Sequence, residues 1–237
     1  SIGAVAALTI VLLAGCGGAS SRPQVLVSAA ASLTDAFGDL EESFENANPD
    51  IDIVLNLGGS SALREQILAG APADVFASAN LRTMEAVVAA GEAAEPSQAF
   101  ATNRLEIAVP ADNPAGIAGL DDFARPEPLF GLCAAAVPCG GFAREALRRG
   151  GIEPSIDTNE PDVRSLLTKI EAGELDAGIV YATDVAAAGD TVIGVAIPAA
   201  DNISAQYTIV LLKAGNNPGE AGAFVDYVLS PAGRAIL

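Results

Sequence analysis

Apolar residues along the chain recur with two periods, one typical of β-strands and the other of α-helices. Short apolar or alternating runs over residues 24–28 and 51–57 predict two strands. The segment between them carries apolar residues at spacings of four, three and four, which predicts one helical stripe: Leu33, Phe37, Leu40 and Phe44. Strands that alternate with helices in this way indicate an α/β fold with mostly parallel sheets.

The same alternation continues to the end of the sequence. A helix is predicted after residues 58–61, with Leu63, Ile67 and Leu68 on its apolar face. Further strands are predicted over residues 74–78, 105–109, 129–133, 177–181, 192–197 and 207–212. Further helices are predicted over residues 82–90, 142–149, 162–172, 220–229 and 231–237.

The composition narrows the class of protein. At 237 residues the chain can build a large core, either as one domain or as two lobes. Its formal charge of −18, from 30 acidic and 12 basic residues, argues against a nucleic-acid partner, because such proteins carry basic stripes. The sequence has no histidine and no cysteine pair with metal-ligand spacing, which argues against a zinc or copper site.

The first sixteen residues resemble a secretion signal. Residues 4–16 are an apolar run shorter than the ~20 residues of a membrane-spanning helix, which favours the hydrophobic region of a signal peptide. Residues 13–16 (LAGC) resemble a bacterial lipobox, in which Cys16 would be lipidated and become the new N-terminus; the alternative is a plain signal peptide that contains Cys16. Residues 17–23 would then form a flexible tether. The mature protein is therefore expected at the outer face of the cytoplasmic membrane, held there by lipid.

That location bears on the other two cysteines. Cys133 and Cys139 lie six positions apart, and in an oxidising compartment this spacing is compatible with a disulfide that closes a small loop. The alternative is a pair of buried free thiols.

Four of the predicted strand-to-helix turns could bind an anion through their backbone N–H groups. Ser32, Ser60, and residues 138–140 and 161–163 each stand where a helix is expected to begin. Such turns present unpaired backbone N–H groups at the positive end of a helix dipole, and in an open α/β sheet they gather at one edge. Several of them facing one cleft would make an anion site with no need for lysine or arginine.

The two serines also have a purely structural interpretation. Serine is a favoured N-cap, and Ser32 with Asp35 resembles a capping box whose acid is one carbon shorter than usual. Gly58 and Gly59 before Ser60 favour the ligand interpretation, because glycine lets a ligand approach the backbone closely.

These turns lie within a series of motifs that covers both halves of the chain. In order they are AAASLTDAF, GGSSALREQI, GAPADVFASA, VPCGGFAREAL, DVRSLLTKIEAGELDAGIVYATD and FVDYVLSPAGRAIL. Together they resemble the periplasmic molybdate-binding proteins of bacterial ABC importers, from about Gln24 to the end of the chain. The resemblance implies a type II periplasmic-binding-protein fold with two lobes and a hinge, each lobe a mixed, mostly parallel sheet flanked by helices. Lobe 1 would comprise residues 24–103 and 205–237, and lobe 2 residues 104–204.

The resemblance also assigns ligand-binding residues. Ser32 and Ser60 would each donate a backbone N–H and a hydroxyl, while Cys139 and Val163 would donate backbone N–H groups. Tyr181 would donate its phenol, although a half-buried aromatic residue at the end of a core strand is the alternative. Two positions depart from the family pattern: Gly59 stands where some relatives have serine, and Cys139 where relatives often have alanine. Neither departure removes a required donor.

A pocket made only of donors suits a particular kind of anion. Molybdate, tungstate and sulfate are fully deprotonated near neutral pH and only accept hydrogen bonds, whereas hydrogen phosphate also needs an acceptor, whose absence costs ~1–3 kcal/mol. The expected function is therefore capture of molybdate or tungstate between the lobes and delivery to an ABC permease, by a monomer without a cofactor. Sulfate, thiosulfate or an organic anion is the alternative cargo.

Two other classes of protein fit the sequence less well. A serine hydrolase would need a base for Ser32 or Ser60, yet there is no G-x-S-x-G motif and the only lysines are Lys169 and Lys213. A receptor for a metal cation would need carboxylates, and the proposed positions contain none. Carboxylate ligands usually recruit an arginine, for which Arg164 beside Val163 is the nearest candidate.

Overall fold

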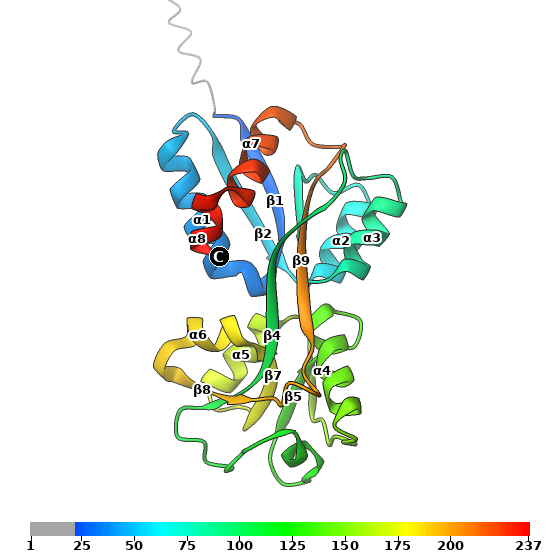
Figure 1. Ribbon diagram of the computed structural model, residues 1–237, viewed down its shortest axis with the longest axis vertical. Coiled ribbons are helices and arrows are strands. Elements are labelled where there is room, and N and C mark those ends of the chain that lie inside the picture. The colour runs from blue at the N-terminus through cyan, green and yellow to red at the C-terminus, as the bar shows by residue number, and fades with distance from the viewer. Residues whose placement is uncertain (1–21) are drawn as a thin grey trace, which may run out of the picture.

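The computed structural model describes residues 22–237, which form two lobes joined by two long strands (Figure 1). The predicted signal peptide with Cys16 lies outside the described residues, as does most of the predicted tether. Within residues 22–237, every helix is too short or too polar to cross a membrane.

Nine strands form one hydrogen-bonded sheet in the order β2-β1-β3-β9-β4-β7-β5-β6, with β8 paired to β4. Their bounds are β1 (Gln24–Ala30), β2 (Asp52–Gly58), β3 (Val75–Ser78), β4 (Gln98–Pro110), β5 (Phe130–Cys133), β6 (Thr158–Glu160), β7 (Ala177–Tyr181), β8 (Val192–Ala196) and β9 (Ser204–Leu211). In lobe 1, β1 runs parallel to β2 and β3; in lobe 2, β5 runs parallel to β6 and β7. Strands β4 and β9 are antiparallel to all their partners.

Helices cover the sheet in both lobes. Lobe 1 carries α1 (Thr34–Ala47), α2 (Ser60–Leu68), α3 (Leu81–Ala89), α7 (Pro218–Leu229) and α8 (Pro231–Ile236), and lobe 2 carries α4 (Pro138–Arg149), α5 (Val163–Glu171) and α6 (Ala182–Ala188) (Figure 1). Three short 3₁₀ turns complete the described residues: η1 (Ala31–Leu33), η2 (Leu120–Ala124) and η3 (Gly189–Thr191). This architecture confirms the predicted two-lobed α/β fold.

Strands β4 and β9 connect the two lobes. Residues 98–104 of β4 pair with β9, whereas residues 105–110 pair with β7 and β8, so one strand belongs to both lobes. The predicted boundary after residue 103 falls inside this strand, and the one after residue 204 falls at the start of β9. Within residues 22–237, the antiparallel pair of β4 and β9 thus connects the sheet of one lobe to that of the other, a geometry that suits a hinge.

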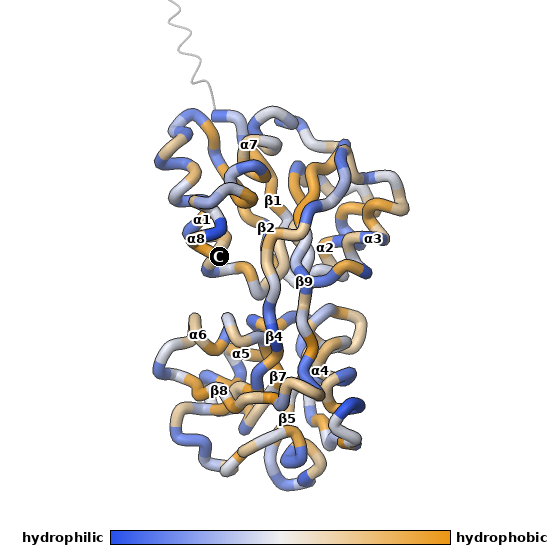
Figure 2. Tube along the Cα trace, viewed as in Figure 1, coloured by the Kyte–Doolittle hydropathy of each residue, from blue (hydrophilic) through white to orange (hydrophobic). Residues whose placement is uncertain are grey.

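One continuous hydrophobic core runs through both lobes, and the rings of Tyr181 and Tyr207, 5.9 Å apart, join its two parts. The predicted stripe on α1 is fully buried, and the rings of Phe37 and Phe44 pack against Phe224 of α7 with centroids 6.2 and 5.3 Å apart. In lobe 2, Phe123 stacks on Phe130 at 4.5 Å. Figure 2 shows apolar segments along the central strands of both lobes and hydrophilic segments at the outer turns.

The structure corrects several sequence-based expectations. Leu68 does not lie on the buried face of α2, because it is 40% exposed at the end of the helix while Leu63 and Ile67 are buried. Helix α4 begins at Pro138 and not at residue 142, since a proline suits the first position of a helix despite the glycines after it. Strand β6 (TNE) and helix α6 (ATDVAAA) were not predicted, because neither has an apolar period to detect.

Candidate functional site

A small cavity between the lobes brings all five predicted ligand-binding residues together. Its volume is about 20 Å³, room for a guest of very few atoms on a scale where ~10–15 Å³ holds one water molecule. Both lobes line it: Ala30, Ala31, Ser32, Gly58, Gly59, Ser60 and Ala79 from lobe 1, and Val137, Pro138, Cys139, Asp162, Val163 and Tyr181 from lobe 2.

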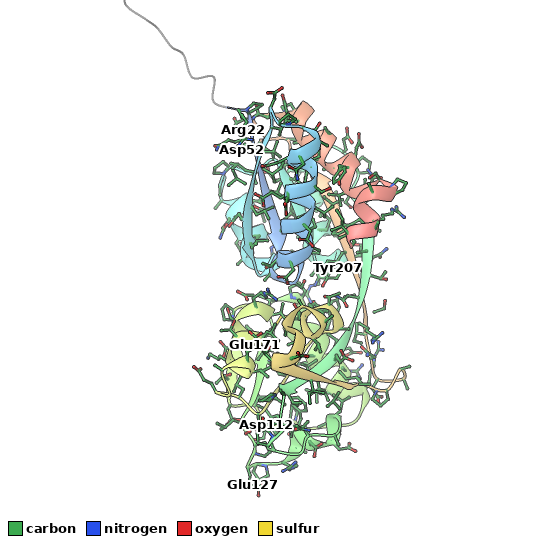
Figure 3. The ribbon with its side chains drawn as sticks, turned by 90° about the vertical axis from the view of Figure 1, so that its left-hand side faces the viewer. Arg22, Asp52, Asp112, Glu127, Glu171 and Tyr207 are labelled. Carbon is green, nitrogen blue, oxygen red and sulfur yellow. A yellow bond between two sulfur atoms is a disulfide. The ribbon has the colours of Figure 1, made fainter. Side chains whose placement is uncertain are left out.

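Ser32 enters the cavity from η1, directly after β1. Its Oγ lies 2.8 Å from the hydroxyl of Tyr207 on β9 and does not cap η1 or α1, so the capping-box interpretation with Asp35 is wrong. Burial raises the pKa of Tyr207, so the phenol keeps its proton at neutral pH. Either hydroxyl can donate in this contact, and because a phenol is a better donor than an alcohol, donation from Tyr207 is favoured, which leaves the Ser32 proton for the cavity. Tyr207 lies at the level where the two lobes meet (Figure 3).

Ser60 is the first residue of α2 and is almost fully buried. Its Oγ accepts a hydrogen bond from the backbone N–H of Ala79 at 3.1 Å, and no side chain caps α2, so the N-cap interpretation is wrong here too. Accepting that bond leaves the Ser60 proton free to donate to a guest in the cavity.

Gly59, just before Ser60, faces lobe 2 at close range. A Cβ atom added there would lie 2.9 Å from the carbonyl oxygen of Pro161 and 3.2 Å from Cγ1 of Val137, both in lobe 2. A side chain at this position would therefore push the lobes apart.

Lobe 2 contributes the starts of two helices. Cys139 is the second residue of α4 and Val163 the first of α5, positions whose backbone N–H groups have no acceptor inside the helix. Cys139 forms a disulfide with Cys133, whose Cα lies 5.8 Å away, and this bond ties the start of α4 to the end of β5. The side chain of Asp162 caps α5 by accepting from the N–H of Ser165 at 2.9 Å, so that carboxylate is occupied at the helix start.

Tyr181 ends β7 and is only 1% exposed. Among the described residues its hydroxyl has no hydrogen-bond partner, although it is buried and lines the cavity. Burial, and after it the neighbouring Tyr207, raise its pKa well above the ordinary value, so it keeps its proton at any physiological pH. A buried hydroxyl without a partner costs ~1–3 kcal/mol, a cost that an acceptor placed in the cavity would remove.

Two residues that support the site were missed from the sequence. Asp184, buried in α6, accepts from the backbone N–H of Tyr181 at 2.9 Å, and its position three residues after Tyr181 is a capping-box spacing that could have identified it. Burial raises the pKa of Asp184 to about 7, and the charge of Arg164 opposes that shift. Tyr207 gave no local signal, because it lies 175 positions from Ser32.

Polar contacts hold the lobes together, among them a hydrogen bond of 2.7 Å from the Asn103 amide to the Thr183 hydroxyl. Arg164 of α5 forms an ion pair with Asp35 of α1 at 2.9 Å, and the hydroxyl of Ser61 donates to the carbonyl of Ala136 at 2.6 Å. No lysine or arginine lines the cavity itself. The structure is therefore a closed arrangement around neutral hydrogen-bond donors.

Comparison with known proteins identifies the family of this chain. The family model described as bacterial extracellular solute-binding protein matches residues 25–237. The molybdate-binding protein ModA of Mycobacterium tuberculosis is 36% identical over 247 residues, which cover 100% of this chain and 95% of ModA. The putative ABC transporter substrate-binding lipoprotein YvgL of Bacillus subtilis is 30% identical over 237 residues, 95% of this chain and 91% of YvgL.

Solved structures show the same fold. The periplasmic molybdate-binding protein of Azotobacter vinelandii superposes with a TM-score of 0.77 at 21% identity, covering 90% of this chain and 95% of that one. The sulfate-binding protein SubI of Mycobacterium tuberculosis superposes with a TM-score of 0.81 at 14% identity, covering 90% and 84%. At such identities both comparisons bear on the fold alone.

Proposed function

Because the chain belongs to the family of bacterial extracellular solute-binding proteins, we propose that it captures molybdate between its lobes and delivers it to an ABC importer. The observation that carries the proposal is the buried hydroxyl of Tyr181, which has no partner among the described residues and lines a small cavity with two serines and two helix starts. An oxyanion is the guest that satisfies all of these donors at once.

Neutral hydrogen-bond donors can bind a dianion in this cavity without a lysine or arginine. A hydrogen bond to a charged acceptor contributes ~1.5–3 kcal/mol, so several convergent donors offset the heavy cost of dehydrating the ion. The starts of α4 and α5 add the positive ends of two helix dipoles. Hydrogen phosphate binds poorly in this account, because its own proton would face donors.

The donors of the cavity do not by themselves distinguish molybdate from other tetrahedral dianions. Molybdate, tungstate and sulfate share charge and tetrahedral shape, so only cavity size distinguishes molybdate from sulfate. The name of the 36% identical relative supports molybdate, and sulfate is the second candidate because it has the same charge and shape. Tungstate, close to molybdate in size, is proposed to bind as well.

Binding is proposed to favour closure of the lobes. Ser32 and Ser60 come from lobe 1, whereas Cys139, Val163 and Tyr181 come from lobe 2, so only the closed form presents every donor to one ion. The permease then recognises the closed state. The protein works as a monomer without a cofactor.

The proposed location is the outer face of the cytoplasmic membrane, with Cys16 as the lipidated residue. The name of the B. subtilis relative, a lipoprotein, supports this anchor. Membrane fractionation of wild type and Cys16→Ala tests it, since the variant should be released.

Titration calorimetry tests the function. Purified protein without residues 1–16 is titrated with molybdate, tungstate, sulfate, hydrogen phosphate and calcium. The proposal expects tight, one-to-one binding of molybdate and tungstate, weaker binding of sulfate and none of calcium. Tighter binding of sulfate than of molybdate would show that the protein captures sulfate. If no dianion bound, both functions would be refuted.

A further inference from the structure

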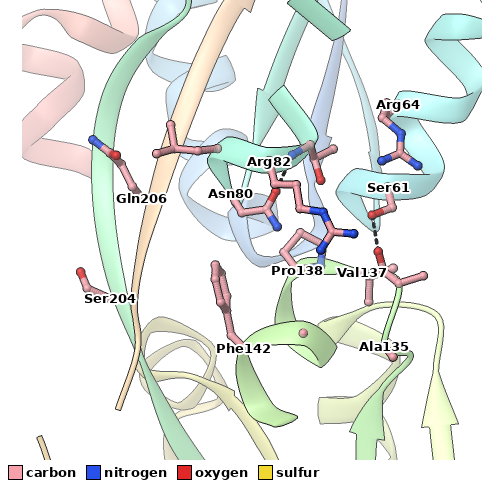
Figure 4. A pocket seen from close by; sticks show the side chains of 14 residues that line it. Ser61, Arg64, Asn80, Arg82, Ala135, Val137, Pro138, Phe142, Ser204 and Gln206 are labelled. Atoms are coloured by element: carbon pink, nitrogen blue, oxygen red, sulfur yellow. Dashed lines mark hydrogen bonds between the residues drawn. The ribbon is translucent and has the colours of Figure 1, made fainter. Parts of the chain in front are cut away.

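A second, larger cavity opens beside the oxyanion site. Its volume is about 440 Å³, and it shares Val137 and Pro138 with the smaller cavity, so the two are neighbours in the same interlobe cleft. Arg64 of α2 and Arg82 of α3 line it, together with Asn80, Gln206 and Phe142, and no aspartate or glutamate does (Figure 4). In a chain of charge −18, a cavity with two arginines and no acid is unusual.

The position of Arg82 is not explained by local structure. It is the second residue of α3, where the positive end of the helix dipole disfavours a cation. Among the described residues it makes no ion pair and its guanidinium no hydrogen bond. Figure 4 shows its guanidinium directed into the cavity, toward Pro138.

Arg64 faces the same space from α2. Its guanidinium lies above Ser61, the residue whose hydroxyl bonds across to lobe 2 (Figure 4). Its one ion-pair partner among the described residues is the neighbouring Glu65, whose side chain is 65% exposed. A solvated partner of this kind neutralises a charge only weakly.

The opposite side of the cleft has the reverse charge. There a cavity of about 230 Å³ also borders the oxyanion site through Ser32, and Asp35 and Asp39 line it without any arginine or lysine. On that side Arg164 pairs with Asp35, which leaves Asp39 as the carboxylate without an ion-pair partner among the described residues. On the other side Arg82 is the guanidinium without such a partner, so a dianion meets a net negative charge on one side and a net positive charge on the other.

We infer that the arginine-lined cavity is the entrance to the oxyanion site, and that Arg64 and Arg82 accelerate capture of the dianion. The inference rests on the proposed function. Neither arginine lines the small cavity, so both act on the ion as it arrives and leave the bound ion to the neutral donors. At physiological ionic strength charges are screened beyond ~8 Å, so this local pair outweighs the distant acidic surface.

Stopped-flow kinetics at low ionic strength tests the inference. The chain has no tryptophan and three tyrosines, of which Tyr181 lines the site and Tyr207 contacts Ser32, so tyrosine fluorescence can report molybdate binding. At about 10 mM ionic strength, Arg64→Gln and Arg82→Gln should each lower the association rate constant about two- to fivefold, and the double variant about tenfold. The dissociation rate constant should stay within about 1.5-fold of wild type.

Matched variants separate this effect from net charge and folding. Arg148→Gln removes the same charge at the far end of α4, ten residues or ~15 Å along the helix from Pro138, and should lower the association rate constant less than Arg82→Gln does at the same low ionic strength. Arg82→Lys keeps the charge and should keep the rate. Near 0.5 M salt, all variants should converge on wild type.

Two results would overturn the inference. An association rate in the double variant equal to wild type at low salt would show that the arginines do not guide the ion. If the double variant instead releases molybdate faster than wild type, with an unchanged association rate and no dependence on salt, the arginines are part of the binding site. In both cases wild type still binds molybdate and the proposed function stands, whereas absence of dianion binding by wild type would remove both proposals.

Discussion

The hydroxyl of Tyr181 is the group on which the site depends most. In Tyr181→Phe the ion loses one charge-assisted hydrogen bond, so molybdate affinity should fall about tenfold in calorimetry. Without ligand, the same variant loses a buried hydroxyl that has no partner among the described residues, so the free energy of unfolding should stay level or rise. Unchanged affinity would remove Tyr181 from the site.

Tyr207 acts on the ligand through Ser32. In Tyr207→Phe the Ser32 hydroxyl loses its donor and its fixed orientation, and molybdate affinity should fall about three- to tenfold. Tyr227→Phe is a matched control, because the Tyr227 hydroxyl also bonds a serine, Ser43, at 2.6 Å but does so away from the cavity. Equal affinity losses in both variants would show a general effect of tyrosine removal.

At the scale of elements, the turn between β2 and α2 sets how closely the lobes meet. Gly59 has φ −60°, which alanine adopts without strain, so Gly59→Ala isolates the contact of its Cβ with Pro161. Molybdate affinity should fall about tenfold while the open protein keeps its melting temperature. Gly38→Ala, where a Cβ meets nothing within 4 Å, should leave affinity unchanged. An affinity for Gly59→Ala equal to wild type would refute the close approach.

The start of α6 gives the protein a pH dependence. The pKa of Asp184 rises from 3.8 to about 7 on folding, so the folded state holds an extra proton between these values and stability falls as pH rises through that window. Above about pH 7, the ionised Asp184 repels the dianion. The positive charge of Arg164 weakens this repulsion, and the negative charges of Asp35 and Asp162 strengthen it.

Asp184→Asn tests this effect. It should remove the loss of stability that Asp184 causes as pH rises from about 4 to about 7, and make molybdate affinity nearly independent of pH between about pH 6.5 and about pH 8.5. Wild-type affinity should fall about threefold over the second interval. Thermal melts and calorimetry at several pH values give both quantities. Asp190→Asn removes an exposed carboxyl from the same lobe and should keep the wild-type pH dependence; an identical profile for both variants would contradict the role of Asp184.

For the whole molecule, the sequence predicted what depends on local pattern. The apolar stripe of α1 and the strand-to-helix turns were recognisable, and with the family resemblance they located the five residues that meet in the cavity. Leu68 was misplaced because periodicity does not show where a helix ends relative to its neighbours. The serines were open to a capping interpretation because only tertiary structure gives Ser32 and Ser60 their actual partners, Tyr207 and Ala79.

The closed arrangement of the lobes was beyond prediction from pattern. The ion pair of Arg164 with Asp35 joins residues 129 positions apart, and the contact of Ser61 with Ala136 joins residues 75 positions apart. The opposite charges of the two flanking cavities likewise depend on which helices the hinge brings together. Such contacts follow from the global fold and leave no periodic trace in the sequence.

A crystal structure of the protein with molybdate, located by the anomalous scattering of molybdenum, tests the central claim most directly. We expect one strong peak in the small cavity, with oxygens within ~2.7–3.1 Å of the Tyr181 and serine hydroxyls and of the N–H groups at the starts of α4 and α5. A peak held instead by the guanidinium groups of Arg64 and Arg82, with the small cavity empty, would contradict it.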